Sequence, residues 1–106
     1  MSELLDKVAV VTGAGRGIGN VIAKKLASRG VSIAALSRSK ENAQSCADEI
    51  NNEYPDKAIA YSVDVSDTEA MLETGKSVLS DFGKVDILIN NAGVTRDNLM
   101  LRMTEE

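Results

Sequence analysis

The chain has 106 residues, 43% of them hydrophobic and 26% charged, which is the size and composition of one ordinary globular domain. A net charge of −4, with only two tyrosines and one phenylalanine for stacking, argues against nucleic-acid binding, and one cysteine without histidine argues against a transition-metal site. No apolar run approaches the roughly 20 residues of a membrane span, and the acidic N-terminus is unlike a signal peptide. We therefore expect a protein of the cytoplasm, or of an organelle matrix after processing, that binds neither nucleic acid nor membrane.

Strands and helices are predicted to alternate along the chain. Apolar and β-branched runs predict strands at residues 7–12, 31–36, 58–63 and 85–90. Apolar residues at helical spacing predict helices at residues 18–29, 40–52 and 66–82. This alternation predicts right-handed βαβ crossovers and hence an α/β fold, a Rossmann-type, doubly wound parallel sheet with the order 3-2-1-4 that is truncated after strand four.

Two details of the predicted helices can be compared with a structure. The first helix has large apolar residues at helical spacing, at Ile18, Val21, Ile22 and Leu26. This stripe is its predicted buried face. Ser66, followed by Glu69 three residues later, has the spacing of a capping box and predicts where the third helix begins.

A glycine-dense turn follows the first predicted strand and leads directly into the first helix. It does not fit the common G-x-G-x-x-G fingerprint. It fits T-G-x-x-x-G-x-G, through Thr12, Gly13, Gly17 and Gly19. Glycine lets the backbone approach a ligand closely, and the N–H groups at the start of a helix attract an anion. The turn therefore predicts a cradle for the phosphates of a dinucleotide, the alternative being a tight connection without a ligand.

The segment after the fourth predicted strand, Asn90-Asn91-Ala92-Gly93, is the second candidate for ligand contact. In the predicted order, the carboxyl ends of strands one and four are neighbours at the topological switch point. Ligands of such sheets bind in the crevice at that point. We therefore expect this segment and the glycine turn to line the same crevice.

The end of the second predicted strand bears on which dinucleotide binds. An NAD site usually has an acid there, which holds the ribose 2′-hydroxyl. Here the sequence reads Ser37-Arg38-Ser39, and the nearest acid is Glu41 in the next helix. Arg38 can pair with a 2′-phosphate, and Arg16 in the glycine turn could supply a second cation. This favours NADP, unless both arginines are ordinary surface charges.

The glycine pattern and Asn90-Asn91-Ala92-Gly93 resemble the short-chain dehydrogenase/reductase family. The continuation Thr95-Arg96-Asp97-Asn98-Leu99, with Arg102-Met103, is similar to the narrower group of 3-oxoacyl-acyl carrier protein reductases, and the resemblance spans residues 1–106. It implies hydride transfer from NADPH to the 3-keto group of a substrate carried by acyl carrier protein, in fatty acid synthesis. It also implies that full-length relatives are homo-oligomeric.

The resemblance implies a role for each cofactor-binding residue. The glycine turn would hold the phosphates, Arg38 the 2′-phosphate, Asp64 and Val65 the adenine, and the segment from Asn90 the inner ribose. The whole predicted set is Thr12, Gly13, Arg16, Gly17, Ile18, Gly19, Arg38, Asp64, Val65, Asn90, Ala92 and Gly93. From the residues alone, Asp64 could equally be a turn or cap aspartate, and Asn90 a brace between strand ends.

No catalytic residue is predicted in the chain. The resembling family uses a tyrosine and a lysine spaced Y-x-x-x-K, with a serine and an asparagine. Here Lys57 follows Tyr54 one residue too early, and Val65 stands four residues after Tyr61. We therefore expect residues 1–106 to be the NADP-binding N-terminal half of a single reductase domain, inactive alone because its catalytic half is absent. The alternatives are another short-chain ketone or alcohol oxidoreductase and a non-catalytic nucleotide-binding module.

Overall fold

Strands and helices alternate along the chain as predicted. The structure is a computed structural model and describes residues 4–15 and 17–91. Its elements are β1 (Val8–Thr12), α1 (Gly17–Ser28), β2 (Ser32–Ser37), α2 (Lys40–Glu53), β3 (Ala58–Ser62), α3 (Thr68–Phe82) and β4 (Ile87–Asn90). These bounds differ from the predicted ones by at most two residues at either end.

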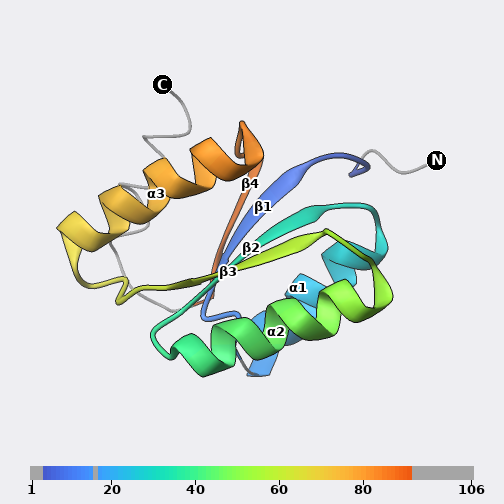
Figure 1. Ribbon diagram of the computed structural model, residues 1–106, viewed down its shortest axis with the longest axis horizontal. Helices are drawn as coiled ribbons and strands as arrows, with labels where there is room; N and C mark the ends of the chain where they lie inside the picture. Colours follow the sequence, from blue (N-terminus) through green and yellow to red (C-terminus); the bar gives the residue numbers. More distant parts are fainter. Residues whose placement is uncertain (1–3, 16, 92–106) are drawn as a thin grey trace.

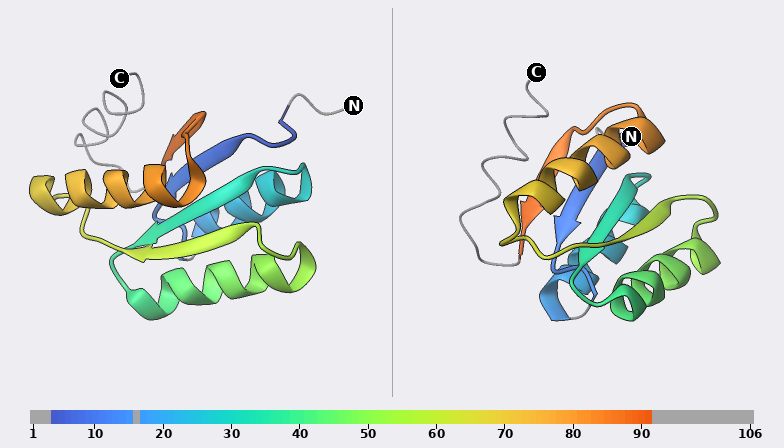
Figure 2. Two further views of the ribbon diagram at one scale, coloured as in Figure 1. Left: turned by 45° about the horizontal axis from the view of Figure 1, so that its top comes forward. Right: turned by 60° about the vertical axis from the view of Figure 1, so that its left-hand side comes forward.

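The strands form one parallel sheet in the order β3-β2-β1-β4, which confirms the predicted topology. β1 pairs with β2 on one side and β4 on the other, with Val10 opposite Ala34 and Leu88. α1 and α2 cover one face of the sheet, and α3 covers the other (Figures 1 and 2). The sheet is therefore doubly wound, and β1, buried on both faces, is apolar up to Thr12 because neither side of it meets water.

The sheet separates two hydrophobic cores. Under α1 and α2 lie Ala9, Val11, Ile33 and Ala35 of the sheet, with Ala23, Ala27, Cys46, Ala47 and Ile50 of the helices. Under α3 lie Val10, Ala34, Leu36 and Val63, with Met71 and Val78. Successive residues of β1 and β2 thus point to opposite faces, as the pleat requires.

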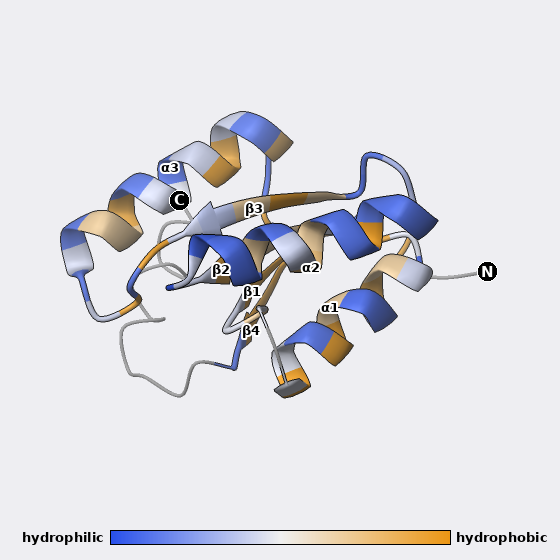
Figure 3. Ribbon diagram, turned by 60° about the horizontal axis from the view of Figure 1, so that its bottom comes forward, coloured by the Kyte–Doolittle hydropathy of each residue, from blue (hydrophilic) through white to orange (hydrophobic). Residues whose placement is uncertain are grey.

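The buried face of α1 differs from the prediction. Gly19, Ala23 and Ala27 are buried, whereas Ile18 and Val21 are 69% and 65% exposed. Small side chains let a helix lie close to the sheet, so the fully buried residues of α1 are small ones, while Leu26 of the predicted stripe is partly buried against the same core. The predicted stripe was therefore wrong at Ile18 and Val21. In Figure 3, apolar residues colour several turns of α1, while α2 beside it is mostly hydrophilic.

The start of α3 also differs from the prediction. The helix begins at Thr68, and the Asp67 carboxylate caps it by accepting a hydrogen bond from the Ala70 N–H at 3.0 Å. Ser66 does not cap the helix, because its hydroxyl donates to the Asp64 carboxylate at 2.7 Å. The predicted capping box was therefore wrong. α2 begins after Ser39, whose hydroxyl accepts from the Asn42 N–H at 3.1 Å.

Two kinds of feature are absent from residues 4–15 and 17–91. No helix in these ranges is long and apolar enough to cross a membrane. No three His, Cys, Asp or Glu side chains there gather closely enough to hold a metal ion.

Candidate functional site

The carboxyl ends of β1, β2 and β3 border a pocket of about 590 Å³. It is lined by Gly13, Gly15, Leu36, Ser37, Arg38, Ser39, Asn42, Val63, Asp64, Val65, Ser66 and Asn91. Its volume lies within the range of small-molecule sites, roughly 300–1,000 Å³. Because it is bordered by the carboxyl ends of the strands, the pocket lies where an open parallel α/β sheet binds its ligands.

The glycine turn keeps its shape through two different properties of glycine. Gly13 and Gly17 have φ angles of 63° and 66°, a left-handed conformation that other residues rarely adopt. Gly19 is needed for a different reason, because a Cβ there would overlap the Gly13 carbonyl oxygen and lie 2.7 Å from Asn91 Nδ2. The first turn of α1 therefore packs directly on the backbone that leads into it.

The ends of β1 and β4 are joined by polar contacts. The buried Thr12 hydroxyl accepts from the Asn91 N–H at 3.0 Å, and its own proton faces Asn90 Oδ1 at 3.3 Å and the Ile89 carbonyl at 3.4 Å. The Asn91 side chain donates to the Gly13 carbonyl at 3.3 Å. Asn90 and Asn91 thus lie beside the glycine turn, as the strand order predicted, and Asn90 takes part in bracing the two strand ends.

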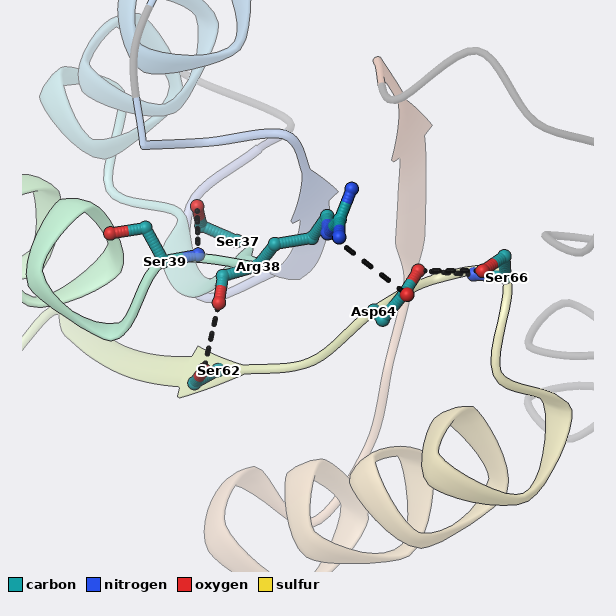
Figure 4. Close-up of polar contacts among 6 residues, drawn as sticks. All are labelled: Ser37, Arg38, Ser39, Ser62, Asp64 and Ser66. Carbon is teal, nitrogen blue, oxygen red and sulfur yellow. Dashed lines mark hydrogen bonds and ion pairs between the residues drawn. The ribbon is translucent and has the colours of Figure 1, made fainter.

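Arg38 and Asp64 face one another across the mouth of the pocket (Figure 4). Arg38 Nε lies 4.0 Å from Asp64 Oδ2, and the arginine side chain is 80% exposed. The Arg38 carbonyl accepts from the Ser62 hydroxyl at 3.1 Å, which ties the turn after β2 to the end of β3. The guanidinium is therefore placed at the pocket and open to solvent, where a ligand can reach it.

The Asp64 carboxylate is held in its ionised form. It accepts hydrogen bonds from the Ser66 hydroxyl at 2.7 Å and from the Ser66 N–H at 3.0 Å. These bonds, and more weakly the charge of Arg38, lower the pKa of Asp64 below its ordinary value. Asp64 therefore makes the local turn that the sequence allowed for and also contributes a negative charge to the pocket wall.

The structure brings together only part of the predicted site. Gly13, Arg38, Asp64 and Val65 line the pocket. Gly17 and Ile18 are exposed at the start of α1, Thr12 and Gly19 are buried behind the turn, and Asn90 ends β4. Arg16, Ala92 and Gly93 lie outside the described residues.

Several pocket residues were not in the predicted set. They are Gly15, Ser37, Ser39, Asn42, Ser66 and Asn91. Four of them directly follow a predicted strand or a predicted binding residue, so their place in the chain was a usable signal. Asn42 lies inside α2 and carries no such signal, because its position in the pocket depends on how α2 packs against the glycine turn.

Comparison with known proteins gives a consistent result. The short chain dehydrogenase family model matches residues 7–106. The 3-oxoacyl-[acyl-carrier-protein] reductase of Vibrio cholerae is 44% identical over 104 residues, which are 98% of this chain and 41% of that protein. The reductase of the same name from Escherichia coli K12 is 44% identical over 101 residues, 94% of this chain and 39% of that protein. The chain thus spans about two fifths of the length of these curated relatives.

Solved structures of similar fold carry either nicotinamide cofactor. A 3-ketoacyl-(acyl-carrier-protein) reductase from Brucella melitensis, complexed with NADH, has a TM-score of 0.75 and 40% identity over 81% of this chain and 34% of its own. L-sorbose reductase from Gluconobacter frateurii, complexed with NADPH and L-sorbose, has a TM-score of 0.81 and 35% identity over 86% of this chain and 35% of its own.

Proposed function

Because the chain belongs to the short-chain dehydrogenase family, as its motifs predicted, we propose that its pocket binds the adenosine end of NADP in preference to NAD. The observation that carries the proposal is the position of Arg38, which lies at the pocket at the end of β2 with its guanidinium exposed. No acid follows β2 before Glu41, so a 2′-phosphate there meets a cation and not the usual carboxylate. Arg16, in the glycine turn, is proposed as a second cation.

The remaining predicted residues divide among the parts of the cofactor. The pyrophosphate would lie on the turn at Gly13, Gly17 and Ile18, facing the positive end of α1. Thr12 and Gly19 would keep that turn closed. Asp64 and Val65 would hold the adenine, and Asn90, Ala92 and Gly93 the inner ribose. The pocket volume and the glycine-rich turn fit a dinucleotide, which in its reduced form would supply a hydride for carbonyl reduction.

For the whole protein, we propose reduction of 3-oxoacyl-acyl carrier protein to the 3-hydroxyacyl product, by a cytoplasmic homo-oligomer. The identity to reductases of that name supports this assignment. No tyrosine in the chain is followed four residues later by a lysine, so residues 1–106 are proposed to be the cofactor-binding part and inactive alone. Reduction of another ketone is the second candidate, supported by the structural similarity to a sugar reductase. A non-catalytic nucleotide-binding module is the third.

Calorimetric titration of residues 1–106 with NADPH and with NADH tests the cofactor assignment. We expect NADPH to bind more tightly, and Arg38→Asp to weaken NADPH binding by about tenfold or more, since it removes a charge-assisted contact and adds a repulsive one. Arg29→Asp is the matched control, because Arg29 is exposed beyond the far end of α1. Equal affinity for both cofactors, unchanged by Arg38→Asp, would contradict the assignment. Turnover of NADPH with an acetoacetyl thioester would contradict the claim that the chain is inactive alone.

A further inference from the structure

The first turn of α2 forms a wall of the pocket beside Arg38. Ser39 caps the helix, and Asn42, at its third position, is half-buried and lines the pocket together with Ser37. Lys40 and Glu41 are exposed, and the first buried residue of α2 is Ala43. Asn42 thus lies between the exposed start of the helix and its buried face, at the pocket wall.

Asn42 is held in place by the glycine turn. A Cβ on Gly15 would lie 2.5 Å from Asn42 Cβ and 2.9 Å from Ser37 Oγ, both closer than side-chain atoms normally come. Gly15 does not have a positive φ, so its backbone conformation does not by itself require glycine. The requirement comes from contact with α2, which sets Asn42 directly against the turn proposed to bind the phosphates.

The Asn42 side-chain amide makes no hydrogen bond to any other residue among those the structure describes. Two other side-chain amides of α2, those of Gln44 and Asn51, do have partners. Gln44 donates to Asp48 at 2.9 Å, and Asn51 both donates to Ala58 and accepts from Lys57 and Ala58. Asn42 is thus a half-buried amide at the pocket wall whose side-chain donors no other described residue uses.

We propose that the Asn42 side-chain amide donates hydrogen bonds to the 2′-phosphate of NADP and is a specificity-determining residue. The inference rests on the proposed NADP site and adds to it a neutral donor on α2. Arg38 lies near Asp64, whose negative charge offsets part of its attraction for an anion. A second donor in contact with the same phosphate would restore that attraction. The helix N-terminus at Ser39 would add a favourable dipole.

The contribution of the 2′-phosphate to binding can be measured with two adenosine nucleotides that differ in this group. Adenosine 2′,5′-bisphosphate carries that phosphate and AMP lacks it, so calorimetric titration of residues 1–106 with each isolates its contribution. Asn42→Ala is expected to weaken the bisphosphate by about five- to tenfold, the effect of losing a hydrogen bond to a charged group at a half-exposed site, and to leave AMP within about twofold. Gln44→Ala, on the same helix outside the pocket, is the matched control and should change neither.

A second variant keeps the role of the amide separate from the shape of the pocket. Asn42→Asp preserves the size of the side chain but replaces its donors with a negative charge, so it should weaken the bisphosphate more than Asn42→Ala does. Circular dichroism of each variant reports whether α2 is intact.

The outcomes distinguish this inference from the function on which it rests. If the wild-type chain fails to prefer the bisphosphate to AMP, both the NADP assignment and the role of Asn42 are wrong. If the wild type prefers the bisphosphate and Arg38→Asp abolishes the preference, but Asn42→Ala changes nothing or weakens both ligands equally, the inference alone is overturned.

Discussion

A methyl group at Gly19 is expected to disrupt the glycine turn more than its size suggests. The Cβ of Gly19→Ala would overlap the Gly13 carbonyl oxygen and lie 2.8 Å from the Gly13 carbonyl carbon. Both are backbone atoms, so no side-chain rotation can relieve the contact. Either α1 must move away from the sheet or the turn after β1 must open.

The loss in the free energy of unfolding caused by Gly19→Ala can be estimated by comparison with a glycine that has space around it. Overpacking a well-packed site typically costs about 1–3 kcal/mol, and a clash with fixed backbone belongs at the upper end of that range. Gly83 ends α3 with φ of 85°, and no atom of residues 4–15 or 17–91, its own neighbours aside, lies within 4 Å of where its Cβ would be. Gly83→Ala therefore carries only the left-handed backbone penalty, about 1–2 kcal/mol. With about 3 kcal/mol taken for Gly19→Ala, its cost should exceed that of Gly83→Ala by about 1–2 kcal/mol.

Urea unfolding followed by far-ultraviolet circular dichroism measures this difference. With a slope of about 1–3 kcal/mol per molar urea, a loss of about 3 kcal/mol lowers the midpoint by roughly 1–3 M. NADPH titration provides the second measurement, because only Gly19→Ala alters the proposed phosphate cradle. If Gly19→Ala unfolds at the same urea concentration as Gly83→Ala and binds NADPH like the wild type, the close approach of α1 to the turn is not what requires glycine.

Two further predictions concern strand ends near the crevice and at the opposite edge. Thr12→Val leaves the Asn91 N–H without its 3.0 Å acceptor and should lower the free energy of unfolding by about 1–3 kcal/mol, whereas Thr12→Ser keeps the hydroxyl and should lose less, as urea midpoints will show. The Asp86 carboxylate accepts a hydrogen bond from the Val8 N–H at 2.9 Å and lies 3.2 Å from the Lys84 ammonium. The hydrogen bond first, and then Lys84, lower the pKa of Asp86. The stability from this carboxylate is complete above the unfolded-state pKa of about 3.9 and is lost as the pH falls through the lower folded-state pKa. Asp86→Asn should therefore reduce the fall in the free energy of unfolding at acid pH, as urea midpoints measured over a pH series will show. If that fall is the same in the variant and the wild type, the Asp86 carboxylate is not its source.

The sheet could be predicted from the sequence because its signals are local. Each strand is an apolar run bounded by a glycine, a serine or a charged turn, and the alternation with helices leaves few possible topologies. The buried face of α1 could not be predicted by the same reasoning. Spacing identified Ile18 and Val21, but the sheet is contacted by Ala23 and Ala27, because that choice depends on the distance between helix and sheet.

In the candidate site, too, residues next to strand ends could be predicted from the sequence, and residues placed by packing could not. Arg38 was predicted because it directly follows a strand, where an NAD site usually has an acid, and Asp64 was implied by the family resemblance; both line the pocket. The capping of α3 was mispredicted because Ser66 has two possible hydrogen-bonding partners, and the sequence does not show that Asp64 is the nearer one. Asn42 was missed since its place in the pocket comes from contact with Gly15, a residue far from it in sequence.

The pairing of β1 with β4 has a consequence for the order in which the molecule folds. Val8 pairs with Ser32, but Ala9 pairs with Ile87, so closing the second pairing spans a loop roughly threefold longer and costs about 1 kcal/mol more chain entropy. The contacts of Thr12 with Asn90 and Asn91 depend on that later pairing. A nucleotide that spans the crevice between β1 and β4 would thus meet its complete site only after the most distant segments have associated, and its binding would select for the fully folded chain.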